Sequence, residues 1–130
     1  MKFLKGSMWP GLLWTVIIFY LLSMDTSNAN EISLLKVYGI DKLIHFAIFA
    51  ILTFLWGAYF FNKETVPSNK TLLLIIILAS TYGMGMEYYQ HFFTTRSFSY
   101  WDGLADALGS AVGALVAKKS PYGNRGRNQN

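Results

Sequence analysis

Four apolar runs constrain the fold of this chain more than any other feature. They cover residues 8–24, 43–61, 71–90 and 101–117. A helix needs roughly 20 mostly apolar residues to cross the hydrocarbon core of a bilayer. The chain is also 53% hydrophobic and only 14% charged, which is too apolar for an ordinary soluble domain. The sequence therefore predicts an all-α fold, an integral membrane four-helix bundle whose solvent is the lipid bilayer.

Chain length and the placement of basic residues predict one domain with both termini cytoplasmic. A chain of 130 residues allows one domain. We place it at 1–117, and we expect 118–130 to be a basic, disordered cytoplasmic tail. Cytoplasmic loops of membrane proteins carry an excess of Lys and Arg. These residues are more frequent before residue 8, in 62–70 and in the tail than in 25–42 and 91–100.

The first run has a second interpretation as a signal peptide. Lys2 and Lys5 precede it, and Ala29 follows it among small residues, as at a cleavage site. The aromatic residues within the run are typical of anchors at a membrane interface. They favour a retained span.

The predicted orientation gathers polar side chains from three separate segments at the outer end of the bundle. These are Asp41, Lys42, His45, Glu87, Gln90, Arg96, Asp102 and Asp106. Residues three or four apart share a helix face. Asp41 and His45 are therefore expected on one face of their helix, and Asp102 and Asp106 on one face of theirs. A charge at mid-bilayer costs roughly 2.5 to 3.5 kcal/mol. We therefore expect these side chains to face one another or a wet cavity, as ligand-binding residues.

The charge of this group indicates that something must offset its acids. Four acids outnumber two permanent cations, so the balance requires a protonated histidine or acid, a bound cation, or a cationic group on a ligand. Glu87 and His91 are four residues apart and could be metal ligands. That spacing is not diagnostic and no HExxH is present, so we expect no metal and no cofactor. His91, beside Phe92 and Phe93, is expected at the membrane interface.

Several candidate side chains also have purely structural interpretations. Glu87 and Arg96 could form a buried ion pair that pins the loop before the last helix. His45 could donate a structural hydrogen bond to Asp41, Glu87 or Asp102. Asp102 could be the N-cap of the last helix, where an acid accepts backbone N–H groups. The residues alone leave these alternatives open.

Two glycines continue the acidic stripe of the last run. Gly109 and Gly113 lie seven and eleven positions after Asp102 and form a GxxxG pattern. Small residues at this spacing let membrane helices approach closely. We expect both to be helix-packing residues, and the same pattern could join copies of the chain into a homo-oligomer.

The polar residues and glycines also occur in an order that resembles a known family. The pattern comprises DKLIHF at 41–46, Glu87, Gln90, Arg96, Phe98, Ser99, Asp102, Gly109 and Gly113. It is similar to the VanZ-like family of small bacterial membrane proteins. The chain departs from that family at Asp106, where asparagine is usual. The resemblance implies a multi-pass protein of the bacterial inner (cytoplasmic) membrane. The family's namesake lowers susceptibility to teicoplanin, a glycopeptide antibiotic with an acyl tail.

These observations predict an outward-facing polar pocket that recognises or modifies an envelope amphiphile and affects susceptibility to teicoplanin or related lipoglycopeptides. The expected partners are the bilayer and a lipid-linked or acylated ligand, whereas basic residues form no stripe for nucleic acid. If the protein is an enzyme, Glu87 and His45 are the expected catalytic acid and base. The alternative is a non-enzymatic structural or interaction module whose charges lock helices together. An ion pathway is disfavoured because the acids gather at one depth.

Overall fold

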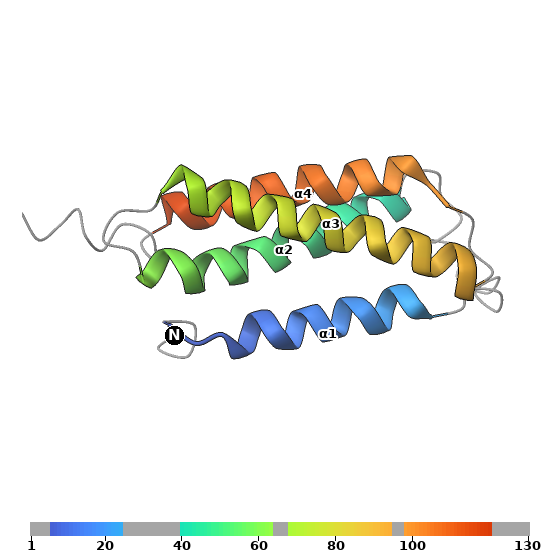
Figure 1. Ribbon diagram of the computed structural model, residues 1–130, viewed down its shortest axis with the longest axis horizontal. Helices are drawn as coiled ribbons and strands as arrows, with labels where there is room; N and C mark the ends of the chain where they lie inside the picture. Colours follow the sequence, from blue (N-terminus) through green and yellow to red (C-terminus); the bar gives the residue numbers. More distant parts are fainter. Residues whose placement is uncertain (1–5, 25–39, 64–67, 95–97, 121–130) are drawn as a thin grey trace, which may run out of the picture.

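The chain folds into four helices that lie side by side along one axis (Figure 1). The computed structural model describes residues 6–24, 40–63, 68–94 and 98–120. Its helices are α1 (Trp9–Ser23), α2 (Ile40–Lys63), α3 (Asn69–Phe93) and α4 (Tyr100–Lys119). The predicted all-α fold with four helices is confirmed. Arg96 and the other residues outside these ranges, including the proposed cleavage site near Ala29, are not among those described.

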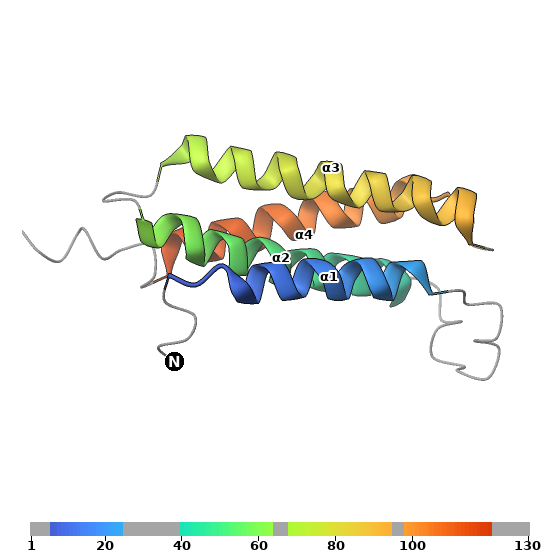
Figure 2. The same cartoon turned by 60° about the horizontal axis from the view of Figure 1, so that its bottom comes forward.

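Helices α2 and α4 form the closest pair and run in the same direction, while α1 and α3 run the opposite way (Figures 1 and 2). Glycines on α4 allow this approach. A Cβ atom at Gly109 would collide with the carbonyl oxygen of Phe46, and one at Gly113 would collide with that of Ala50. The small-residue stripe of α4 therefore lies against the α2 backbone, which sets the spacing of the side chains near it.

Helix α1 packs against α2 and α3 through apolar side chains and through hydrogen bonds between helices. Ile18 and Leu22 of α1 are buried in one cluster with residues of α2 and α3. The indole Nε1 of Trp14 donates to the Ile48 carbonyl oxygen at 2.9 Å. The Tyr82 hydroxyl donates to the Thr15 carbonyl oxygen at 2.9 Å. Side chains of α1 and α3 thus use backbone carbonyls as partners across helices.

The outer surface of the bundle is strongly apolar. On α3, Leu73, Leu74, Ile77 and Leu78 are each more than half exposed. Several polar and charged side chains are instead enclosed between the helices, and Asp106 in particular has no exposed surface. Of the four described helices, only α2 and α3 are both long and apolar enough to cross a membrane. Helix α1 is apolar but has only 15 residues, and α4 has 20 residues but is not apolar enough. Membrane insertion and the orientation of the termini remain predictions.

Candidate functional site

Six of the expected polar residues meet at one end of the bundle, around the imidazole of His45. The cluster, called the polar cluster below, consists of Asp41, Lys42 and His45 from the start of α2, Glu87 from the last turns of α3, and Asp102 and Asp106 from the start of α4. Because α2 and α4 are parallel and α3 is antiparallel to them, their polar ends coincide. The His45, Glu87 and Asp106 side chains are at most 1% exposed.

The shortest contact in the polar cluster joins His45 to Asp106. Nδ1 of His45 lies 2.9 Å from Oδ1 of Asp106, which is a hydrogen bond. Gly83 of α3 makes room for this carboxylate, since a Cβ atom there would come within 2.7 Å of Asp106 Oδ2. The sequence-based prediction that His45 hydrogen-bonds Asp41, Glu87 or Asp102 was wrong. These three carboxylates lie 3.7–3.9 Å from the imidazole, beyond hydrogen-bond distance. Asp106 is one turn further along α4 than Asp102, and its carboxylate lies beside Nδ1 of the imidazole.

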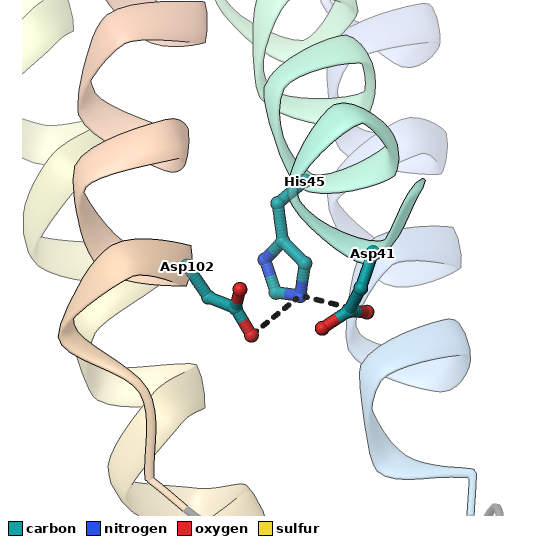
Figure 3. Close-up of side chains that lie close together, drawn as sticks. All are labelled: Asp41, His45 and Asp102. Atoms are coloured by element: carbon teal, nitrogen blue, oxygen red, sulfur yellow. Dashed lines mark ion pairs between the residues drawn. The ribbon is translucent and has the colours of Figure 1, made fainter. Parts of the chain in front are cut away.

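The second ring nitrogen of His45 faces the two remaining aspartates (Figure 3). Nε2 lies 3.9 Å from Asp41 Oδ1 and 3.7 Å from Asp102 Oδ2. It is buried and has no hydrogen-bond partner among the described residues. Lys42 approaches the other oxygen of Asp102, with Nζ 3.6 Å from Oδ1. Asp41 and Lys42 are the partly exposed members, at 41% and 34% of their side-chain surface, and form the rim of the polar cluster.

Glu87 connects the polar cluster to the start of α4. Its Oε2 accepts a hydrogen bond from the backbone N–H of Ser99 at 3.3 Å, and its Oε1 lies 3.9 Å from His45 Nδ1. The Ser99 side chain accepts from the N–H of Asp102 and is therefore the N-cap of α4. The alternative in which Asp102 caps this helix was wrong. The expected ion pair between Glu87 and Arg96 falls on a residue that is not described.

Gln90 and His91 do not join the polar cluster. Gln90 is buried, and its Nε2 donates to the carbonyl oxygen of Leu22 at 2.8 Å, so its amide is directed at α1. His91 is exposed, with its ring centroid 5.1 Å from that of Phe92 and 6.4 Å from that of Phe98. Of the two histidines, only His45 belongs to a group of side chains close enough to share a metal ion, among the residues described.

One role and one residue were not anticipated from the sequence. Ser99 was part of the family pattern, but its role as the N-cap of α4 was not predicted. Ser110 is fully buried, and its hydroxyl has no hydrogen-bond partner within the described part of the chain. Its position four residues after Asp106 places it on the same face of α4, which is the signal that could have identified it.

A separate cavity of about 310 Å³ lies between α1, α2 and α3. Its lining is almost entirely apolar and includes Leu52, Trp56, Ile75 and Tyr82. None of the residues of the polar cluster lines it. The cavity is therefore an apolar space distinct from the polar cluster and further along the helices.

Comparison with known proteins decides the family. A sequence model of the VanZ/LLP1 family matches residues 8–120, which include all four helices. The chain belongs to the VanZ/LLP1 family. This confirms the resemblance inferred from the polar residues and glycines.

One relative of this VanZ/LLP1 chain is an uncharacterized protein of Schizosaccharomyces pombe. The two are 30% identical over 99 residues, which are 76% of this chain and 59% of the yeast protein. The chain thus spans about three fifths of that relative. No solved structure matches the chain.

Proposed function

We propose that this VanZ/LLP1 protein is a multi-pass protein of the bacterial inner membrane with the polar cluster at its outer face. The distribution of polarity supports insertion, since large apolar side chains cover the exterior while His45, Glu87 and Asp106 are enclosed. In water this arrangement would expose apolar surface and bury charge, both at a cost. In a bilayer the apolar exterior is in contact with lipid, and enclosure keeps the charged side chains away from it.

The basic residues support the proposed orientation. Lys63 ends α2, Lys70 begins α3, and Lys118 and Lys119 end α4, all at the opposite end of the bundle from His45. Lys118 also hydrogen-bonds Asn69 there, which ties the ends of α3 and α4 together. Since cytoplasmic segments are rich in Lys and Arg, this end and both termini face the cytoplasm. The polar cluster then lies at the level of the outer leaflet.

At that position the protein recognises or modifies an envelope amphiphile. The observation that carries this function is the rim of the polar cluster, where half-buried Asp41 and Lys42 sit above enclosed charges on an otherwise apolar bundle. A phosphate or carboxylate of the amphiphile's head group pairs with Lys42, while hydroxyl or amine groups meet Asp41 and Asp102. The acyl tail remains in lipid beside the exposed leucines of α4. Binding of such molecules is the basis on which the protein alters susceptibility to teicoplanin.

Catalysis at this site would use Glu87 and His45 as acid and base, with the imidazole held by Asp106. Their closest atoms are 3.9 Å apart, which allows a proton to pass through a bridging group but not directly. A demonstrated turnover that survived both Glu87→Gln and His45→Ala would exclude these roles.

Mass spectrometry of co-purifying lipids tests the proposed function. Wild type, Lys42→Gln and the matched control Lys70→Gln are extracted in mild detergent, and their lipids are compared. Lys42 is at the rim, whereas Lys70 is an exposed lysine at the other end of the bundle. The proposal expects an anionic amphiphile enriched in wild type and control but lost from Lys42→Gln. The same bulk phospholipids in all three samples would refute it.

A structural module is the second candidate, favoured by the nearly complete burial of His45, Glu87 and Asp106. In this case the polar cluster locks α2, α3 and α4 together and binds no amphiphile. The GxxxG stripe packs helices within the chain, because both of its glycines are buried against the α2 backbone, so association with other chains would use another surface. Glu87→Gln would then lower the yield of folded protein, while Lys42→Gln would leave the lipid composition unchanged. The two functions therefore predict different results for the rim lysine.

A further inference from the structure

We propose that Asp41, His45 and Asp102 form a binding site for one divalent transition-metal ion that accepts imidazole and carboxylate ligands, such as Zn²⁺. The sequence alone favoured no metal, although it left open a bound cation among the acids, and the only ligand pair that its helical spacing singled out was Glu87 with His91. The geometry points to a different set of ligands, which lies at the rim of the polar cluster. The inference does not depend on an amphiphile being bound.

The orientation of His45 is the first observation that supports a metal. Its Nδ1 is held by Asp106 at 2.9 Å, so that nitrogen carries the proton when the ring is neutral. The other nitrogen, Nε2, then presents a lone pair. It is buried, lacks a hydrogen-bond partner among the described residues, and is directed between Asp41 and Asp102 (Figure 3). A carboxylate that holds the far nitrogen of a ligand histidine is the usual arrangement around protein-bound zinc.

The distances between the three ligand atoms fit one small cation. Nε2 is 3.9 Å from Asp41 Oδ1 and 3.7 Å from Asp102 Oδ2. All three atoms lie within 4.8 Å of one another. Two ligands about 2.1 Å from a tetrahedral ion are roughly 3.4 Å apart. Binding therefore requires each carboxylate to approach the imidazole by about half an ångström or less. The two carboxylates, which lie within 4.8 Å of each other, must also close to about 3.4 Å.

Charge provides a third reason. Within the described part of the polar cluster, four carboxyl groups accompany one lysine and one histidine. The Lys42 ammonium pairs with Oδ1 of Asp102 and leaves Oδ2 facing Nε2. A divalent cation between Asp41 and Asp102 would neutralise two of the carboxylates. Three protein ligands leave at least one further position on the ion, open at the partly exposed rim, for water or a substrate group.

Zinc titration of the full chain tests this site. The protein is purified in detergent without a polyhistidine tag, treated with chelator, and titrated with Zn²⁺, and bound metal is measured after gel filtration. The expected result is one Zn²⁺ per chain. Asp41→Asn and Asp102→Asn each remove a carboxylate ligand. Mutation of a residue that only hydrogen-bonds a metal ligand lowers metal affinity roughly 10- to 100-fold, so each of these variants should lower zinc affinity by more than that.

Two further variants make the test specific. His91→Gln removes the other imidazole of the chain, which is exposed and outside the polar cluster, and should leave zinc binding unchanged. His45→Gln should abolish binding. If that variant fails to fold, Asp41→Asn still decides, because its side chain is 41% exposed. Wild type without stoichiometric zinc, or equal binding by wild type, Asp41→Asn and Asp102→Asn, would overturn the proposal.

Discussion

Replacement of Gly109 by alanine should separate α2 from α4 next to the polar cluster. A Cβ atom at Gly109 would lie 2.9 Å from the carbonyl carbon of Phe46 and 3.0 Å from its Cα, with the carbonyl oxygen closer still. Ordinary Cβ contacts begin at about 3.4 Å. The obstacle is backbone, which cannot move aside as a side chain can. Relieving the two carbon contacts alone requires the helices to separate by about half an ångström, and relieving the closer oxygen contact requires a larger separation.

That displacement acts directly on the site, because Phe46 follows His45 and Gly109 lies one turn beyond Asp106. The hydrogen bond between His45 and Asp106 would lengthen from 2.9 Å to the limit of hydrogen bonding. Overpacking costs about 1–3 kcal/mol, and losing a hydrogen bond to a charged group costs about 1.5–3 kcal/mol. Alanine recovers about 1 kcal/mol of helix propensity. The expected net loss of stability is about 1.5–5 kcal/mol.

Gly85→Ala is the matched control, since no atom lies within 4 Å of a Cβ built at Gly85. This variant should be as stable as wild type or more stable by up to about 1 kcal/mol. Circular dichroism of each protein in detergent, followed through a denaturant titration, gives the free energies of unfolding. Equal stability of Gly109→Ala and Gly85→Ala would refute the backbone contact as the determinant of helix spacing.

Two other substitutions probe the polar residues. Asp106→Asn keeps an oxygen that can accept a hydrogen bond from His45 Nδ1 and should change the free energy of unfolding by less than about 1 kcal/mol. Asp106→Ala leaves this buried donor unpaired and should lower the free energy of unfolding by about 3 kcal/mol or more. Equal unfolding midpoints for the two variants would contradict the hydrogen bond. Ser99→Ala removes the N-cap side chain of α4 and should lower the free energy of unfolding by about 1 kcal/mol in the same denaturant titration. A stable Ser99→Ala variant would mean that the cap is not needed.

The helices could be predicted from the sequence because their apolar runs are long and continuous. Each helix begins and ends within three residues of a run. The largest differences are three residues each, at the end of α3 and at the start of α2. Helix α2 starts at Ile40 and so includes Asp41 and Lys42. Polar residues at the end of a helix lower hydropathy without stopping the helix, so an apolar run underestimates its length.

Convergence of the polar residues could also be predicted, because it depends only on how deep each residue lies along its helix. The individual contacts could not, because they depend on rotation of each helix about its axis. His45 therefore bonds Asp106, which was not among its expected partners. Gln90 lies at the same depth as the polar cluster but is rotated toward Leu22 of α1. The side chain that fills the space beside Gly83 also depends on this rotation, and in the structure it is Asp106.

Location of the polar cluster at the outer face of a membrane is the central claim, and the absence of cysteine from the chain makes it directly testable. Single cysteines are introduced by Ile40→Cys, at the start of α2, and by Ser120→Cys, at the C-cap of α4. Whole cells are then treated with a membrane-impermeant maleimide. The proposed orientation predicts that the cysteine at 40 is labelled in intact cells and the cysteine at 120 only after permeabilisation. Labelling of position 120 in intact cells, with position 40 protected, would contradict it.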